Sequence, residues 1–142
     1  MKYVLIAGIV IIIGFLAALS FIPIGIEPLT EVYFENHTKL PSVMLPLQEK
    51  EFAFSVHNFE YKNMNYSYEI KADYLNVSNI IGNGKFELAN NQTTTINQKF
   101  SFNSAFERAR ISVNVMKDNN ETIDIHFWVD DVRPRVVITQ AR

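Results

Sequence analysis

Five asparagines stand in the pattern that accepts an N-linked oligosaccharide, Asn-x-Ser/Thr with x other than proline. They are Asn36, Asn65, Asn76, Asn91 and Asn120. Because this glycan is added outside the cytoplasm, occupied sites would place this part of the chain on the outer side of a membrane. Asparagine is also a common turn residue, and all of these sites except Asn65 fall between predicted strands. The pattern therefore predicts glycosylation sites, with turn-forming asparagines as the alternative.

Side chains that could bind a metal ion or carry out catalysis form no recognisable pattern. The sequence has three histidines, on one predicted loop and two predicted strands, without a carboxylate at ligand spacing: His37, His57 and His126. Neither Asp130-Asp131 nor Asp118 with Glu121 forms the contiguous oxygen-rich loop that calcium uses. No serine stands in a glycine-flanked elbow, and there is no glycine-rich phosphate loop. We therefore expect neither an enzyme nor a metal site, and no cofactor.

The composition narrows the class of protein further. The net charge of −2 and the pI of about 5.9 leave no basic surplus to neutralise phosphates, so nucleic acid is not an expected partner. The absence of cysteine excludes disulfides, thiolate metal sites and a cysteine nucleophile. The chain has 11 Phe, six Tyr and one Trp, which could build the packed core that a small domain without disulfides needs.

Residues 1–22 predict a single transmembrane helix. No residue from Tyr3 to Phe21 is charged, and this length of helix crosses a hydrocarbon core of about 30 Å. Lys2 precedes the apolar run, whereas Glu27 and Glu31 follow it, so the positive-inside rule places the N-terminus in the cytoplasm and the remaining chain outside. The expected partner of residues 3–21 is therefore the lipid bilayer.

A cleaved signal peptide is the alternative for this segment. Ala18 and Ser20 are small residues before a potential cut after Ser20, although the apolar run exceeds the about 7–15 residues usual in signal peptides. Residues 23–29 then form a short linker that contains Pro23 and Pro28 and spans at most about 20–25 Å. We expect the following domain, residues 30–142, to lie close to the bilayer.

Beyond the linker the hydrophobic residues alternate with a period of two, which is typical of β-strands. Turn residues recur every 8–15 positions, including Gly82-Asn83-Gly84, Asn90-Asn91 and Asp118-Asn119-Asn120. We expect an all-β, Ig-like antiparallel sandwich of about seven strands. The expected strands are Thr30–Glu35, Glu51–His57, Tyr66–Tyr74, Lys85–Leu88, Thr94–Phe102, Arg108–Lys117 and Thr122–Asp130.

The alternation also predicts which side chains face the core. We expect inward positions to include Phe54, Ile70, Val113 and Phe127. In the last strand His126 and Trp128 should face outward, where a large aromatic residue is favoured at binding surfaces. A bulge or a covering loop that buries Trp128 is the alternative. The sequence thus indicates a partner-binding surface at Trp128 and His126.

Several strand segments resemble an archaeal family, the domain of unknown function catalogued as number 1616. They are Leu29-Thr30-Glu31-Val32-Tyr33-Phe34, Phe54-Ser55-Val56-His57-Asn58, Asn65-Tyr66-Ser67-Tyr68 and His126-Phe127-Trp128-Val129, within residues 29–131. The resemblance implies an archaeal source and a β-sandwich held outside the membrane after transmembrane helices, often several. It implies no catalytic residue, and this chain has one predicted helix.

These observations favour a non-catalytic, membrane-anchored module of the cell envelope. Such a module would be a glycosylated accessory subunit of a membrane complex or a contact with the surface layer, with a protein partner or self-association. The alternatives are a pilus-like filament subunit or filament anchor, and a carbohydrate-binding module that uses Trp128. The segment Val132–Arg142 would add an eighth strand or pair with a partner's sheet edge.

Overall fold

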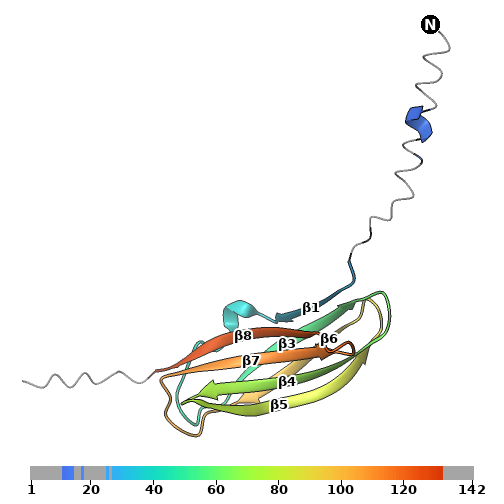
Figure 1. Ribbon diagram of the computed structural model, residues 1–142. Coiled ribbons are helices and arrows are strands. Elements are labelled where there is room, and N and C mark those ends of the chain that lie inside the picture. The colour runs from blue at the N-terminus through green and yellow to red at the C-terminus, as the bar shows by residue number, and fades with distance from the viewer. Residues whose placement is uncertain (1–10, 15–16, 18–24, 26, 133–142) are drawn as a thin grey trace, which may run out of the picture.

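The computed structural model describes residues 11–14, 17, 25 and 27–132 (Figure 1). Residues 11–14 and 17 are α-helical. Within the described residues no helix has the length and apolar character needed to span a membrane. Most of the predicted anchor, residues 1–22, and all of residues 133–142 lie outside the described part of the chain, so the anchor, its cleavage and the C-terminal strand stay predictions.

Residues 27–132 form two facing β-sheets (Figure 1). The three-stranded sheet has the order β1 (Leu29–Phe34), β3 (Lys50–Phe59), β6 (Thr93–Phe100). The five-stranded sheet has the order β2 (Val43–Met44), β8 (Thr122–Asp131), β7 (Arg108–Lys117), β4 (Met64–Tyr74), β5 (Val77–Leu88). A short 3-10 helix, η1 (His37–Lys39), lies between β1 and β2. The predicted all-β sandwich is confirmed, with eight strands among the described residues.

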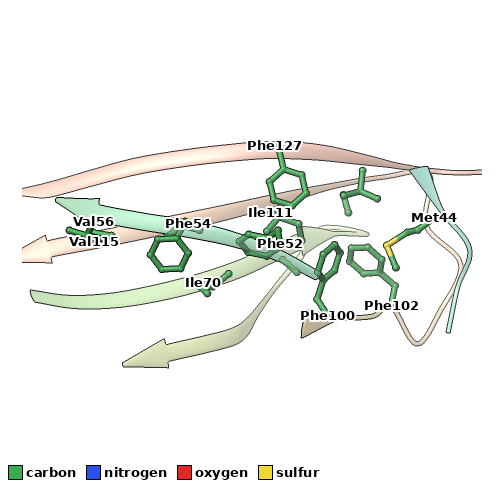
Figure 2. Close-up of a cluster of buried hydrophobic side chains, with 14 of the residues drawn as sticks. Met44, Phe52, Phe54, Val56, Ile70, Phe100, Phe102, Ile111, Val115 and Phe127 are labelled. Carbon is green, nitrogen blue, oxygen red and sulfur yellow. The ribbon is translucent and has the colours of Figure 1, made fainter. Parts of the chain in front are cut away.

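The core lies between the two sheets, and the predicted alternation is confirmed there. Phe54, Ile70 and Val113 are fully buried at 0% exposure, and Phe127 is 8% exposed. Figure 2 shows aromatic rings from both sheets meeting near Met44. Phe127 packs edge-on against Phe34 and Phe52, with ring centroids 5.3 and 5.1 Å away. Such edge-to-face pairs add to the free energy gained by burying the rings.

The predicted turn at Gly82-Asn83-Gly84 is wrong. These residues lie inside β5, and the turn falls earlier, at Leu75 and Asn76, whose φ angles are 52° and 60°. Two residues of positive φ between paired strands suit the twist of a tight hairpin, and asparagine tolerates that conformation. The glycines serve close packing instead, because a Cβ at Gly84 would lie 2.6 Å from the Tyr68 ring.

Two further differences concern strand boundaries. β2 was not predicted from the sequence; it pairs in parallel with the end of β8 and buries Met44 completely. The predicted strand Thr94–Phe102 ends at Phe100, although Phe102 is buried from the loop that follows. β2 and the loop that contains Phe102 each contribute one side chain to the core without belonging to a long paired strand. Neither segment therefore shows a sustained alternating pattern in the sequence.

The chain enters and leaves the sandwich at opposite ends. At the N-terminal end Leu29 pairs with Phe59, and the turns β5–β6 and β7–β8 lie at the same end. At the C-terminal end Tyr74 pairs with Val77, and the chain leaves after Asp131 (Figure 1).

Candidate interaction surface

The outer face of β8 carries both residues predicted to bind a partner. Trp128 is 48% exposed and His126 is also exposed, so neither a bulge nor a loop covers them. The two rings meet edge-on, with centroids 6.3 Å apart. We define the β8 patch as these two residues with the charged side chains beside them: Arg108, Arg110, Asp124, His126, Trp128 and Asp130.

Ion pairs hold the side chains of the β8 patch in place. Arg108 pairs with Asp130 at 3.0 Å, and its guanidinium carbon lies 5.2 Å from the centre of the Trp128 ring. Arg110 donates to Asp124 at 3.1 Å and lies 3.2 Å from Nδ1 of His126. A large aromatic ring framed by arginine has the composition of energetically important sites in protein interfaces. The arrangement presents an exposed aromatic ring beside paired charges on the outer face of β8.

The histidines do not gather into a metal site. His57 stacks on Phe59, with ring centroids 3.7 Å apart, and its Nε2 lies 3.3 Å from Oδ1 of Asn91. His37 lies in η1, at the opposite end of the sandwich from His57. Within residues 27–132 there is no group of three histidine or acidic side chains that could hold an ion.

The acidic side chains Asp118, Glu121 and Asp130 make contacts other than those of a calcium site. Oδ2 of Asp118 accepts hydrogen bonds from the backbone N–H and side-chain amide of Asn65, at 3.1 and 3.2 Å. Asp130 pairs with Arg108, and Glu121 pairs with Lys117. These contacts organise turns and strand ends and do not direct several oxygens at one point.

All five predicted glycosylation asparagines are exposed. Asn65, Asn91 and Asn120 lie at the N-terminal end of the sandwich, whereas Asn36 and Asn76 lie at the C-terminal end. Four of them have positive φ angles: Asn36 (49°), Asn76 (60°), Asn91 (63°) and Asn120 (64°). Asparagine tolerates this left-handed conformation better than most residues. The exposure of all five permits glycan transfer. In the four with positive φ, the backbone conformation alone is a sufficient reason for asparagine at that position.

Two adjoining hollows lie on the outer face of the five-stranded sheet, over β4, β5 and β7. Their volumes are about 610 and 440 Å³, and both are lined by Ser67, Lys85 and Met116. Asn65 and Asn120 line the larger hollow. Charged side chains of both signs line these open surfaces, with Lys85 and Glu87 in the larger hollow and Lys85 and Glu69 in the smaller one. A glycan on either asparagine would start next to the hollow.

A buried polar cluster at the N-terminal end is absent from the sequence-based predictions. Lys117 Nζ lies 2.7 Å from Oε1 of Glu60 and 2.5 Å from Oε2 of Glu121, and the Lys117 side chain is 5% exposed. Thr30 donates to Glu60 at 2.8 Å, and its hydroxyl lies 3.0 Å from that of Tyr66. The alternation through Val113 and Val115 continues to Lys117 and places it on the inward face of β7. This pattern could have predicted that Lys117 is buried.

Asn58 is a second buried polar residue that the sequence reading missed. It is 0% exposed and donates to the carbonyl oxygens of Lys62 and Leu88 at 2.8 and 2.9 Å. Its own side-chain oxygen accepts the N–H of Glu60 at 2.9 Å. Asn58 thus joins the loop after β3 to the end of β5, and with the Lys117 cluster it closes the N-terminal end of the core.

Comparison with solved structures defines the class as an Ig-like β-sandwich. The CARDB domain of a Pyrococcus furiosus protein, in complex with di-metal ions, is 14% identical, with a TM-score of 0.55, and the match covers 74% of this chain and 94% of that one. A superoxide reductase of Ignicoccus hospitalis is 10% identical, with a TM-score of 0.55, over 75% and 82% of the two chains. At these identities the likeness concerns the fold alone.

A third structural neighbour comes from Bacillus subtilis. The sporulation control protein Spo0M of Bacillus subtilis is 9% identical, with a TM-score of 0.53, and the match covers 78% of this chain and 51% of that one. No protein-family model and no curated protein matches the chain. Membership of family 1616 therefore stays a prediction. The CARDB neighbour supports the Ig-like fold of this chain.

Proposed function

We propose that this chain is a non-catalytic module of the cell envelope. Residues 1–22 anchor it, with the N-terminus in the cytoplasm, and the domain of residues 30–142 stands on the outer side. The observation that carries the proposal is the exposure of all five glycosylation asparagines on one sandwich. The uncharged run from Tyr3 to Phe21 behind Lys2 supports the anchor and its orientation.

The β8 patch is the surface through which the module binds a protein partner. Trp128 supplies the apolar anchor, and Arg108 and Arg110 supply the charged rim. A partner in the same membrane, or a surface layer above it, fits this composition. The resemblance to family 1616 supports a membrane complex, in which a partner supplies the additional helices that relatives carry.

The glycosylation sites at the N-terminal end lie close to the proposed membrane surface. The chain enters the sandwich at Leu29, so glycans on Asn65, Asn91 and Asn120 would surround the attachment point of a short linker. Bulky hydrated groups there would keep the surface around the attachment point solvated. The C-terminal end and most of the β8 patch remain accessible to a partner.

Two measurements on the full-length protein test the proposal: its mass and its retention in membranes. The protein is purified from its native host or from a host with an equivalent glycosylation pathway. We expect the protein to remain in membranes after high-salt and alkaline washing and to be heavier than its sequence. Thr38→Ala, Ser67→Ala, Ser78→Ala, Thr93→Ala and Thr122→Ala should each lower the mass at occupied sites. Exchanging Ser and Thr at the same positions preserves the acceptor pattern and is the matched control.

A mature N-terminus at Phe21 with release into the medium would contradict the anchor. A mass equal to the sequence in every variant would contradict glycosylation and leave turn formation as the role of these asparagines. The two outcomes are independent, because an anchored domain needs no glycan and a secreted domain can carry several.

A further inference from the structure

Among the residues that the structure describes, no strand pairs with most of the outer edge of β8. β2 pairs with β8 at Asp130 and Asp131 and nowhere else in the described ladder. The N–H of Asp130 donates to Ser42 on that side, at 2.9 Å. Alternate residues of a strand direct their backbone groups to the same side, so Trp128, His126 and Asp124 also present theirs to this edge. Within the described residues, no strand pairs with them there.

The same side of the sandwich is incompletely covered. Phe127 and Val129 are buried, but Ile123 and Ile125, which face inward on the same strand, are half-buried. An additional strand beside β8 would cover these two isoleucines and satisfy the free backbone groups. Edge strands that combine apolar inward residues with unpaired backbone groups are sites of strand addition.

The chain itself contains a segment suited to this edge. Residues 133–142 include Val136-Val137-Ile138, three β-branched residues in succession, which favour extended structure. The segment carries three arginines and no acidic residue. Residues 27–132 carry nine Lys and Arg against 15 Asp and Glu, a net charge of −6. The segment and the sandwich are therefore complementary in charge as well as in hydrogen-bonding capacity.

We propose that residues 133–142 of one copy pair as a strand with the open edge of β8, Asp124 to Trp128, in a second copy. A second copy is the occupant because β2 fills the edge next to the point where the chain leaves. The N–H of Val132 lies 3.4 Å from the Met44 carbonyl oxygen. At Val132 the chain therefore still runs beside β2 and leads away from the open edge of its own β8. Such a contact joins two different surfaces, so it generates a row of copies.

Cysteine crosslinking of the full-length protein in mild detergent tests the pairing, since the chain has no cysteine of its own. His126→Cys is combined in turn with Val136→Cys, Val137→Cys and Ile138→Cys. We expect at least one pair to give disulfide-linked multimers under oxidation, in steps of one chain mass. Ser67→Cys on β4, combined with the same three, is the matched control and should stay monomeric.

An internal disulfide in the His126 pairs would show that the segment folds on its own sandwich and would overturn the proposal. Absence of any crosslink specific to His126 would also overturn it. Failure here leaves membrane retention and glycosylation untouched, so it is distinguishable from failure of the proposed function.

A backbone substitution gives a second readout. His126→Pro removes an N–H that points away from β7, a position at which an edge strand tolerates proline. The unsubstituted protein is the reference. We expect its native mass in detergent to exceed that of one chain, and the native mass of His126→Pro to fall to that of one chain. A native mass of His126→Pro equal to that of the unsubstituted protein, with unchanged circular dichroism, would contradict strand addition.

Discussion

Lys117 and Glu60 form an ion pair inside the N-terminal end of the sandwich, with Nζ and Oε1 2.7 Å apart and side chains 5% and 10% exposed. The hydrogen bond from Lys117 holds the pKa of Glu60 below its usual value, although burial acts in the opposite direction. Burial also opposes the charge of Lys117, but hydrogen bonds to Glu121 and Glu60 outweigh it and raise the pKa of Lys117. Both groups are therefore charged at neutral pH.

Removing one member of this pair should cost more than removing a surface pair. Lys117→Met leaves the Glu60 carboxylate buried without its counter-charge, and we expect a loss of about 3–5 kcal/mol in the free energy of unfolding. Glu60→Leu in addition should recover much of this loss. Lys99→Met breaks the exposed pair with Glu49, at 2.9 Å, and should cost less than about 1 kcal/mol. Denaturant unfolding of residues 27–142 measures all four proteins; equal losses for the two lysine variants would refute a buried pair.

The same pair predicts a pH dependence. Because the folded state lowers the pKa of Glu60, its contribution to stability is present above the usual glutamate value of 4.5 and is lost as the pH falls through the folded-state pKa. Glu60→Gln should remove this part of the acid loss. The measurement is the thermal midpoint against pH for both proteins. Parallel curves would show that Glu60 does not contribute to the acid sensitivity.

Adjacent residues on β8 test the register. Phe127 is 8% exposed, and Phe127→Ala should cost about 3–5 kcal/mol. Trp128 is 48% exposed, and Trp128→Ala should change stability by no more than about 1 kcal/mol while weakening partner binding. Isothermal denaturation distinguishes them, and a larger effect for Trp128 would invert the assignment of the two faces.

Residue alternation predicted most of the fold because one face of β3, β4, β7 and β8 is largely buried. The boundaries of β7 and the inward residues Ile70 and Val113 follow from it directly. The turn at Leu75 and Asn76 could not be separated from Gly82-Asn83-Gly84 because either sequence is compatible with a turn. Local pattern also carries no information on the partner of Lys117, since Glu60 reaches it through tertiary packing.

Gly84 tests the corrected role of the β5 glycines. A Cβ there would lie 2.6 Å from the Tyr68 ring, so Gly84→Ala should displace that ring and cost about 1–3 kcal/mol. The neighbouring exposed substitution Asn83→Ala is the control and should have little effect. If Gly84→Ala were neutral or stabilising in thermal unfolding, the close approach of Tyr68 would not be a packing constraint.

Substitutions at the asparagines with positive φ can distinguish a role in turn formation from a role in glycan attachment. Asn120 has a φ of 64°, so Asn120→Gln should destabilise the domain by about 1 kcal/mol, whereas Asn120→Gly should not. Asn65 does not have a positive φ, so Asn65→Gln should lose no stability through backbone strain. Unfolding of unglycosylated protein isolates this effect. An identical response of Asn120→Gln and Asn120→Gly would exclude backbone conformation as its cause.

Protease digestion of intact cells is the most direct test of the central claim, that an anchored sandwich stands outside the membrane. The full-length protein carries a tag before Lys2 for detection, and a cytoplasmic protein in the same cells reports lysis. We predict that protease removes the sandwich from unlysed cells and leaves a membrane-bound fragment that contains the tag and residues 1–22. Protection of the sandwich until the cells are lysed, with loss of the tag before lysis, would contradict the account.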